Sequence, residues 1–403
     1  METASAAPAA RLDLLDALRG FALLGVLLAN LRDFSLHQFL LDTSAIQDGV
    51  AQQLMAALLD AKAATLFSLL FGVGFAMQMR AREDAAPRYR RRLLLLLLIG
   101  LAHAWLLWWG DILRYYALLG LLLLPMARWS PRRLALAGIA VALFAAPLLA
   151  PFAKAWLPAV TPHARAAAEA LAAFSSPDPG RAWAANLDYD LRMRLANWSL
   201  AGFVLGRLMV GAALGATTLF SHPHERRRAW LGILAAGLAV GMPATAFALL
   251  RDQQILFNDG WWAGADARAA ARVIRAAASL SLGLAYMAAF ALLFQHGLPR
   301  KLLMVFAPAG RMALSNYLAQ SLIGVALYYG AGAGLGPARE LSPVLLLGLA
   351  LFAVQSAGSA WWLRRFHYGP CEWLWRSATC GSWQTLRRRA TAVNAPQRRM
   401  ENA

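Results

Sequence analysis

Long apolar stretches recur along nearly the whole chain and limit it to a narrow set of folds. Runs such as Leu93–Trp109 and Val344–Trp362 approach the roughly 20 residues that a helix needs to cross the ~30 Å core of a bilayer. Backbone groups in lipid must be hydrogen-bonded internally, so a spanning segment is a helix or part of a closed barrel. These runs are continuous rather than alternating, which favours helices. The sequence therefore predicts an all-α, polytopic transmembrane helix bundle.

About ten such stretches give the predicted organisation. The composition agrees, because 60% of the 403 residues are hydrophobic and the mean hydropathy is +0.48. Pro308–Gly310 predicts a break in the ninth stretch, and the tenth begins just after Pro343, which suits a helix N-terminus. We expect an N-terminal segment over 1–13, a long extracytoplasmic loop over 154–196 and a basic cytoplasmic tail over 365–403. The bundle covers 14–364, with spans at 14–33, 63–80, 93–109, 112–128, 133–153, 197–220, 229–250, 273–297, 302–329 and 344–364.

Basic residues fill every second connection between the predicted spans, and the net charge is +18. Cytoplasmic loops of membrane proteins carry an excess of Lys and Arg, so we expect both termini in the cytoplasm and an integral protein of the plasma (inner) membrane. The arginines lie between spans rather than on one soluble domain, so we expect a lipid bilayer and no nucleic acid as partner. The basic connections are 80–92, 128–133, 226–228, 300–301 and the tail after Arg364, whereas Asp33, Asp42, Asp48, Asp60, Asp252, Asp259 and Asp266 lie in the others.

The cysteines give no sign of a metal site or a disulfide. Cys371 and Cys380 both lie in the predicted cytoplasmic tail, where a disulfide is not expected. Their spacing matches no metal motif. We therefore expect no bound metal and no bound cofactor.

A few polar side chains interrupt the apolar stretches, and they are the main clue to function. An ionisable or amide group in hydrocarbon costs a few kcal/mol unless it is paired or lines a polar cavity. Such residues indicate a polar site inside the bundle rather than a passive anchor. They are Arg19, Asn30, His103, Asp111, Arg207, Arg311, Asn316 and Gln320.

His103 lies in the middle of the third span, and Asp111 follows it. A neutral histidine can accept a proton from a hydroxyl nucleophile near pH 7, whereas a structural histidine would bond to a neighbouring helix. In a continuous helix the eight residues between them correspond to about 12 Å. The two therefore form a direct catalytic pair only if the chain folds back at Gly110. Asp111 also fits an interfacial ion pair with Arg114.

The first span carries Arg19 near its predicted cytoplasmic end and Asn30 near its outer end, about 16 Å apart along a helix. Arg19 fits a phosphate-bearing ligand, lipid head groups or a pair with Asp16. Asn30 can hold a carbonyl or an oxyanion, or bridge two helices. His37, in the outer loop, either reaches the mouth of such a site or is an ordinary loop residue.

The ninth span carries an unusual number of polar residues. Arg311, Ser315 and Gln320 recur near helical spacing, with Asn316 beside them. Their face must point into the bundle, either lining a functional cavity or forming a polar zipper between helices. We predict that spans one, three and nine meet around one cavity. The residues predicted to share it are Asn30, His103, Ser315, Asn316 and Gln320.

Motifs spread over nearly the whole chain resemble those of one family. They are Arg11–Asp13 with Asp16–Gly25, Leu66–Gly72, His103 with Trp108–Leu113, Gly310–Ser321 and Phe366–Arg376. As a set they are similar to the domain-of-unknown-function 418 family, also called YeiB-like. That family groups with a clan of membrane acyltransferases, which includes the acyltransferase-3 enzymes and lysosomal heparan glucosaminide N-acetyltransferase.

The resemblance implies a bundle of about ten helices that passes an acyl group from cytosolic acyl-CoA to a sugar across the membrane. The acyltransferase-3 pattern in the first helix is an arginine, ten residues and a histidine. Arg19 matches the arginine, but Asn30 stands at the histidine position. The heparan enzyme is more similar here, because it has an asparagine at the end of the corresponding helix and a histidine shortly beyond. His37 offers that second residue at a different spacing.

The leading hypothesis is a membrane acyltransferase that uses acyl-CoA as a co-substrate. Arg19 and Arg311 would meet the phosphates, and His103 or His37 would act as general base on a hydroxyl of a sugar or other envelope acceptor. Asn30 would steady the carbonyl or the acceptor. One alternative is a transporter or flippase that uses the same polar cavity, although no internal repeat supports it. Another is a non-catalytic acyltransferase-like scaffold.

Overall fold

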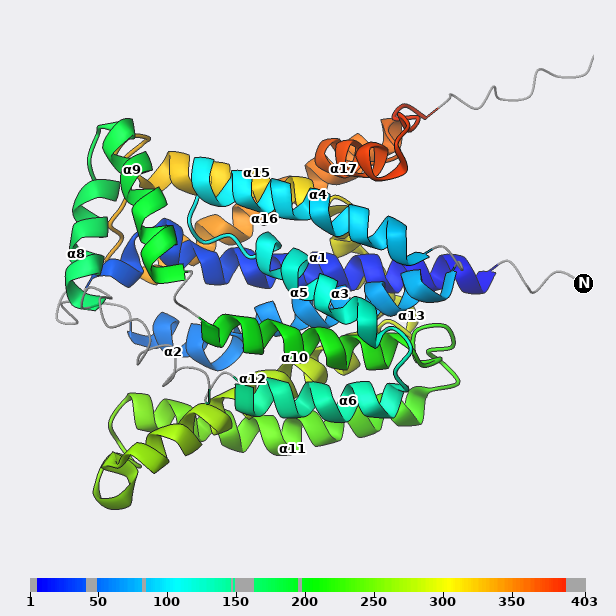
Figure 1. Cartoon of the computed structure of the whole chain (residues 1–403), viewed down its shortest axis with the longest axis horizontal. Coiled ribbons are helices and arrows are strands. Elements are labelled where there is room, and N and C mark those ends of the chain that lie inside the picture. Colours follow the sequence, from blue (N-terminus) through cyan, green and yellow to red (C-terminus); the bar gives the residue numbers. More distant parts are fainter. Residues whose placement is uncertain are drawn as a thin grey trace, which may run out of the picture.

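Helices make up almost all the regular structure in the described part of the chain. The computed structural model describes residues 6–40, 49–81, 85–145, 148, 163–194 and 198–388. Within these ranges the elements are helices, apart from one isolated β-bridge between Phe366 and Arg387. Most of the long helices lie side by side along one axis (Figure 1). The all-α prediction is confirmed for these residues.

Among the described residues, five segments are long and apolar enough to cross a membrane, and two shorter apolar helices accompany them. The five are Asp13–Phe34, Gly49–Arg80, Arg227–Asp252, Asp266–Leu293 and Leu341–Arg365, and the two are Leu113–Met126 and Leu200–Gly215. Length and composition thus mark the chain as a helical membrane protein. The α-helices are α1 (Ala6–Phe34), α2 (Gly49–Leu58), α3 (Lys62–Ala81), α4 (Ala85–Leu106), α5 (Leu113–Leu123), α6 (Pro131–Ala140), α8 (His163–Phe174), α9 (Pro179–Tyr189), α10 (Trp198–Gly215), α11 (Arg227–Asp252), α12 (Ala265–Leu293), α13 (Gly297–Leu303), α14 (Ala307–Arg311), α15 (Ala313–Tyr328), α16 (Leu341–Arg365) and α17 (Pro370–Cys380).

Helices lie at the positions of the ten predicted spans, but in the described residues five segments are long and apolar enough to cross a membrane, and two of the predicted spans differ in detail. The fifth continues from α6 as a π-helical turn over Val141–Ala145, and most of its remainder lies outside the described residues. The ninth breaks at Met312, between α14 and α15, and not at Pro308–Gly310. Pro308 falls in the first turn of α14, where its missing N–H has no helical partner to lose.

Helix α1 is the element around which the others are arranged. Its first half packs in one apolar cluster with α3 and α12, and its second half packs in a larger one with α4, α5 and α15. Helix α14 lies directly on its backbone: a Cβ at Gly310 would stand 1.8 Å from the carbonyl oxygen of Asp16, and one at Gly20 would stand 1.9 Å from that of Phe306. This contact fixes Arg311 beside the arginine-bearing face of α1.

The two ends of the bundle are capped differently. The predicted loop over 154–196 contains a helical hairpin, α8 and α9, at one end of the bundle (Figure 1). The start of α1 and helix α17 lie at the opposite end. Residues 1–5 and 389–403, which belong to the predicted terminal segments, lie outside the described ranges.

Candidate functional site

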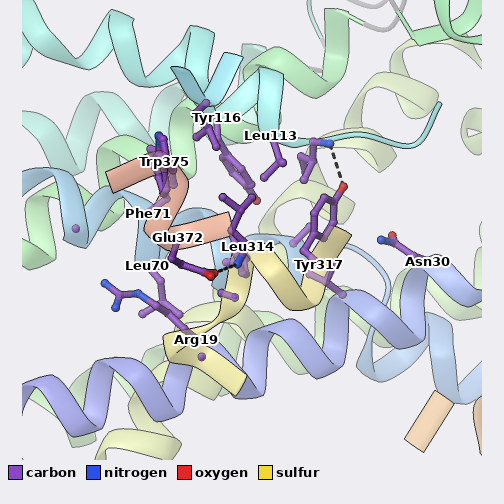
Figure 2. Close-up of a pocket in the computed structure, with 18 of the residues that line it drawn as sticks. Arg19, Asn30, Leu70, Phe71, Leu113, Tyr116, Leu314, Tyr317, Glu372 and Trp375 are labelled. Carbon is purple, nitrogen blue, oxygen red and sulfur yellow. Dashed lines mark hydrogen bonds between the residues drawn. The ribbon is translucent and has the colours of Figure 1, made fainter. Parts of the chain in front are cut away.

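A cavity of about 600 Å³ lies within the bundle. Its walls come mainly from α1, α3, α4, α5, α14, α15 and α17, so the three spans predicted to meet do share one cavity. Most of the lining is apolar, and Figure 2 shows part of it. The polar or aromatic hydroxyl residues in the lining are Arg19, Asn30, Asp33, Gln78, Tyr89, Arg92, Tyr116, Arg311, Tyr317, Glu372 and Arg376.

The cavity follows α1 for a large part of its length. Arg19, Val26, Asn30 and Asp33 all line it from one face of that helix. Fourteen residues of helix between the first and last of these correspond to about 21 Å. Figure 2 places Arg19 and Asn30 far apart along α1. The cavity is therefore a long slot, with different chemistry at its two ends.

Four arginines from four helices gather at one end. Arg19 bonds to Asp16 at 2.9 Å, and Arg311 follows the glycine that rests on the same turn of α1. Arg92 donates to the side-chain oxygen of Gln78 at 3.1 Å and lies near Arg19 and Arg376. Sequence reasoning found Arg19 and Arg311 but missed the other two, because they look like ordinary members of a basic loop and a basic tail.

Helix α17 closes this arginine end. The Glu372 carboxylate accepts hydrogen bonds from the backbone N–H groups of Leu314 (2.7 Å) and Ser315 (3.0 Å) and from the Ser315 hydroxyl (2.5 Å). A carboxylate is well placed at a helix N-terminus, where the first N–H groups lack helical partners. Trp375 donates to the Arg92 carbonyl at 2.9 Å, and the Arg92 guanidinium lies 4.2 Å from its ring centroid. Ser315 thus anchors α17 at the edge of the cavity.

His103 and Asp111 form a direct pair. The chain leaves α4 after Leu106, turns back, and starts α5 at Leu113. This is the fold-back on which the pair depended. The His103 Nδ1 and Asp111 Oδ2 atoms lie 2.9 Å apart, and both side chains are buried. A carboxylate can only accept, so in the neutral imidazole Nδ1 donates and Nε2 carries the lone pair.

The turn that makes this pair is held by several contacts. The other carboxylate oxygen of Asp111 accepts from the Arg114 backbone N–H at 3.0 Å, which anchors the first turn of α5. Gly100 lets α5 approach α4, since a Cβ there would stand 2.6 Å from the Arg114 nitrogen. The Arg114 guanidinium instead forms a buried two-point ion pair with Asp190. Asn186 accepts from the Trp109 N–H at 2.6 Å and donates to the Ala104 carbonyl at 2.8 Å.

The His103–Asp111 pair lies just behind the cavity wall. Gly110 and Ile112, on either side of Asp111, both line the cavity, as does Tyr317. The His103 ring centroid is 5.2 Å from that of Tyr317, yet His103 is not itself a lining residue. Its Nε2 atom is buried and has no hydrogen-bond partner among the described residues.

His37 lies elsewhere and is fully engaged. Its Nδ1 atom donates to the Ala338 carbonyl at 2.9 Å, and its Nε2 atom lies 3.1 Å from the donor nitrogen of the Gln52 amide. Both ring nitrogens therefore have partners. His37 is buried and is not a lining residue of the cavity.

The polar face of α15 mostly turns away from the cavity. Asn316 donates to Ser359 at 2.9 Å, and Gln320 donates to Gln355 at 2.9 Å. Both partners lie on α16, so these residues form a polar seam between two helices. Tyr317 and Leu314 line the cavity from α15 instead. The shared space predicted for Asn30, His103, Ser315, Asn316 and Gln320 thus contains only Asn30 among its lining residues.

Arg207 is fully buried between α3, α10 and α12. It donates to Thr65 (2.6 Å), Ser279 (2.7 Å) and the Phe203 carbonyl (2.9 Å). These bonds tie three helices together, and Arg207 does not line the cavity. Its place is therefore structural.

Comparison with known proteins gives the family. A profile of the family "Protein of unknown function (DUF418)" matches residues 214–382. The chain is 31% identical to the uncharacterized protein YxaH of Bacillus subtilis (strain 168), with 93% of this chain and 96% of that protein aligned. It is 30% identical to the uncharacterized protein YeiB of Escherichia coli (strain K12), with 91% and 95% aligned. The chain belongs to the YeiB-like DUF418 family. No solved structure gives a significant match.

Proposed function

We propose that this protein is a membrane acyltransferase, related to the clan of the acyltransferase-3 enzymes and heparan glucosaminide N-acetyltransferase. One observation carries the proposal: a single cavity joins an arginine-lined end to a wall backed by the His103–Asp111 pair. An acyl transfer from acyl-CoA needs a site for an anionic donor and a base for the acceptor. The two parts of this cavity have the chemistry for both tasks.

The charge distribution supports an orientation in the membrane. The arginine end of the cavity lies at the start of α4, and that start belongs to the basic connection 80–92. Short connections rich in arginine stay in the cytoplasm. We therefore propose ten spans in the plasma (inner) membrane with both termini inside. Acyl-CoA would enter from the cytoplasm, and Asn30 would lie toward the outer side.

The shape of the cavity suits a long donor. The phosphates of acyl-CoA would meet Arg19 and Arg311, with Arg92 and Arg376 adding positive charge, because guanidinium groups match phosphate oxygens. About 16 Å of α1 separate Arg19 from Asn30. A donor held at the arginines must reach across that distance with a narrow arm, and the pantetheine arm of CoA has that form. The acceptor is a hydroxyl of a sugar or another envelope molecule.

The proposed chemistry is a direct acyl transfer. Nε2 of His103 takes the proton of the acceptor hydroxyl while the oxygen attacks the thioester carbonyl. Asp111 holds the tautomer and stabilises the imidazolium through the Nδ1 hydrogen bond. Asn30 donates to the oxyanion of the tetrahedral intermediate. That intermediate collapses, the carbon–sulfur bond breaks, and the imidazolium returns the proton to the CoA thiolate.

The test is binding and turnover of acyl-CoA by the full chain in lipid nanodiscs. Acetyl-CoA and longer acyl-CoA thioesters should bind, and turnover should release free CoA thiol. Arg19→Gln combined with Arg311→Gln should weaken binding by about tenfold or more, since a charged hydrogen bond contributes roughly 1.5–3 kcal/mol. Arg228→Gln, at an exposed arginine in the first turn of α11, is the matched control. Absence of any acyl-CoA binding would refute the proposal.

A transporter is the second candidate, because the helix break at Met312 adjoins the cavity. Broken helices beside a central cavity are typical of secondary transporters. Counterflow of a substrate in liposomes without release of CoA thiol would favour this alternative over acyl transfer.

A further inference from the structure

Tyr317 stands between the His103–Asp111 pair and the cavity. It lines the cavity, whereas His103 behind it does not. The two ring centroids are 5.2 Å apart with the planes inclined at 50°. Figure 2 shows the Tyr317 ring reaching from α15 toward the backbone at the start of α5. In this arrangement a molecule in the cavity meets the tyrosine before it can meet the histidine.

The histidine behind this ring has an unused acceptor. His103 is only 4% exposed, and its Nε2 atom has no hydrogen-bond partner among the described residues. A buried acceptor without a partner is destabilising, so buried polar atoms are rarely left this way. Nδ1 is fixed as the donor to Asp111 at 2.9 Å. A group that fits Nε2 must therefore bring its own proton, as a hydroxyl or an amine does.

The Tyr317 ring borders open space on its cavity side. The Tyr317 hydroxyl accepts from the Ile112 N–H at 3.4 Å, which is long for a hydrogen bond. Because the ring lines the cavity, it has room to turn into that space by rotation about its two side-chain torsions. The His103–Asp111 pair, by contrast, is locked by the turn and by the Arg114 N–H.

The geometry points to Tyr317 as a gate over a hidden subsite. When its ring turns aside, Nε2 of His103 faces the cavity and accepts a hydrogen bond from a hydroxyl or amine of the bound molecule. The gate follows from the contacts alone, whereas the use of this subsite for acyl transfer rests on the proposed function. Tyr317 is then a positioning residue that decides when the base meets the acceptor.

Chemical labelling of His103 tests the gate directly. Diethyl pyrocarbonate modifies neutral imidazole nitrogens, and peptide mass spectrometry of the full chain in nanodiscs gives the rate at each histidine. His222, which is exposed, serves as internal reference. Wild-type His103 should react slowly, and Tyr317→Ala should raise its rate by about tenfold or more, because access scales with the open fraction. Tyr317→Phe keeps the ring and should give a smaller rise.

A second variant and a stability measurement control for misfolding. If Tyr317→Ala does not give folded protein, Tyr317→Leu replaces it, since it removes the ring but keeps apolar volume. An unchanged His103 rate in a variant that unfolds at the wild-type temperature overturns the gate. The labelling rate does not depend on catalysis, so a protein that never turns over acyl-CoA can still show the gate, and an active one can still lack it.

Discussion

His37 and His103 are both buried histidines, 2% and 4% exposed, and they are bonded in opposite ways. His37 uses both ring nitrogens, one toward the Ala338 carbonyl and one toward the Gln52 amide. His103 uses Nδ1 toward Asp111 and leaves Nε2 without a described partner. His37 connects three segments of the chain through its two hydrogen bonds, whereas His103 has a ring nitrogen without a described partner behind the cavity wall. Burial does not separate the two histidines, but the number of engaged ring nitrogens does.

Asp190→Ala should have the largest effect on the difference between the two histidines. It removes a contact that supports the turn carrying Asp111, the partner of His103. The change leaves the Arg114 guanidinium buried without its carboxylate partner, and breaking a buried pair costs about 3–5 kcal/mol. Thermal unfolding in detergent should show a large loss of stability. Asp188→Ala removes an exposed pair with Arg192 and is the matched control, expected to cost less than about 1 kcal/mol. Equal losses in the two variants would show that the turn does not depend on Asp190.

His103→Gln should give the next largest effect, and it falls on turnover. Glutamine keeps the size and hydrogen bonding but cannot take a proton, so release of CoA thiol should fall by about a hundredfold or more. Expression and unfolding temperature should stay near the wild type. His222→Gln, at an exposed site, controls for loss of any histidine. Retained turnover would remove His103 as the base, and a folding defect alone would favour a structural role.

His37→Gln should show the reverse pattern. It disturbs the bonds to Ala338 and Gln52, so stability should fall by about 1–3 kcal/mol. Turnover for each folded molecule should change little. Comparing activity with the folded fraction in the same preparation separates the two quantities. A loss of turnover without a loss of stability would transfer the chemical role from His103 to His37.

The smallest effect concerns the two cysteines of α17, which differ in burial. Burial raises the pKa of the Cys371 thiol, so less of it is thiolate at a given pH. Maleimide should therefore label Cys371 several-fold more slowly than the exposed Cys380 at pH 7, and its rate should keep rising at higher pH. Glu372→Gln weakens the contact of α17 with α15 and should bring the two rates together. Equal rates in the wild type would show that α17 is not docked as described.

Much of the fold could be predicted because the length of an apolar run can be read from the run itself. Runs such as Leu93–Trp109 predict helices without any knowledge of their neighbours. The break at Met312 was harder to place. The first turn of a helix tolerates proline, so Pro308 lies within α14 and does not mark the position of the break. The helices α8 and α9 were expected as a surface loop, since short amphipathic helices carry no spanning signal.

The site could be predicted only in part, because its contacts join distant segments. Arg19, Asn30 and Arg311 stood out as polar residues in apolar surroundings, and all three line the cavity. Spacing along a helix placed His103 and Asp111 about 12 Å apart, and only the turn at Gly110 brings them together. Glu372 and Tyr317 fell within the family motifs Phe366–Arg376 and Gly310–Ser321, but neither residue type nor spacing marked them as cavity residues. The outward turn of Asn316 and Gln320 depends on α16, which helical periodicity does not reveal.

The contacts of α9 also impose an order on biosynthesis. The partner of Arg114 is Asp190, which is synthesised 76 residues later. The partner of the Trp109 N–H is Asn186, which is synthesised 77 residues later. A ribosome that has just completed α5 has not yet made either partner. The arginine must stay hydrated, or be shielded by the insertion machinery, until the hairpin emerges and docks. The contacts that hold the turn beside His103 and Asp111 therefore form late, and a nascent chain stopped before α9 has α4 and α5 but neither of these two partners.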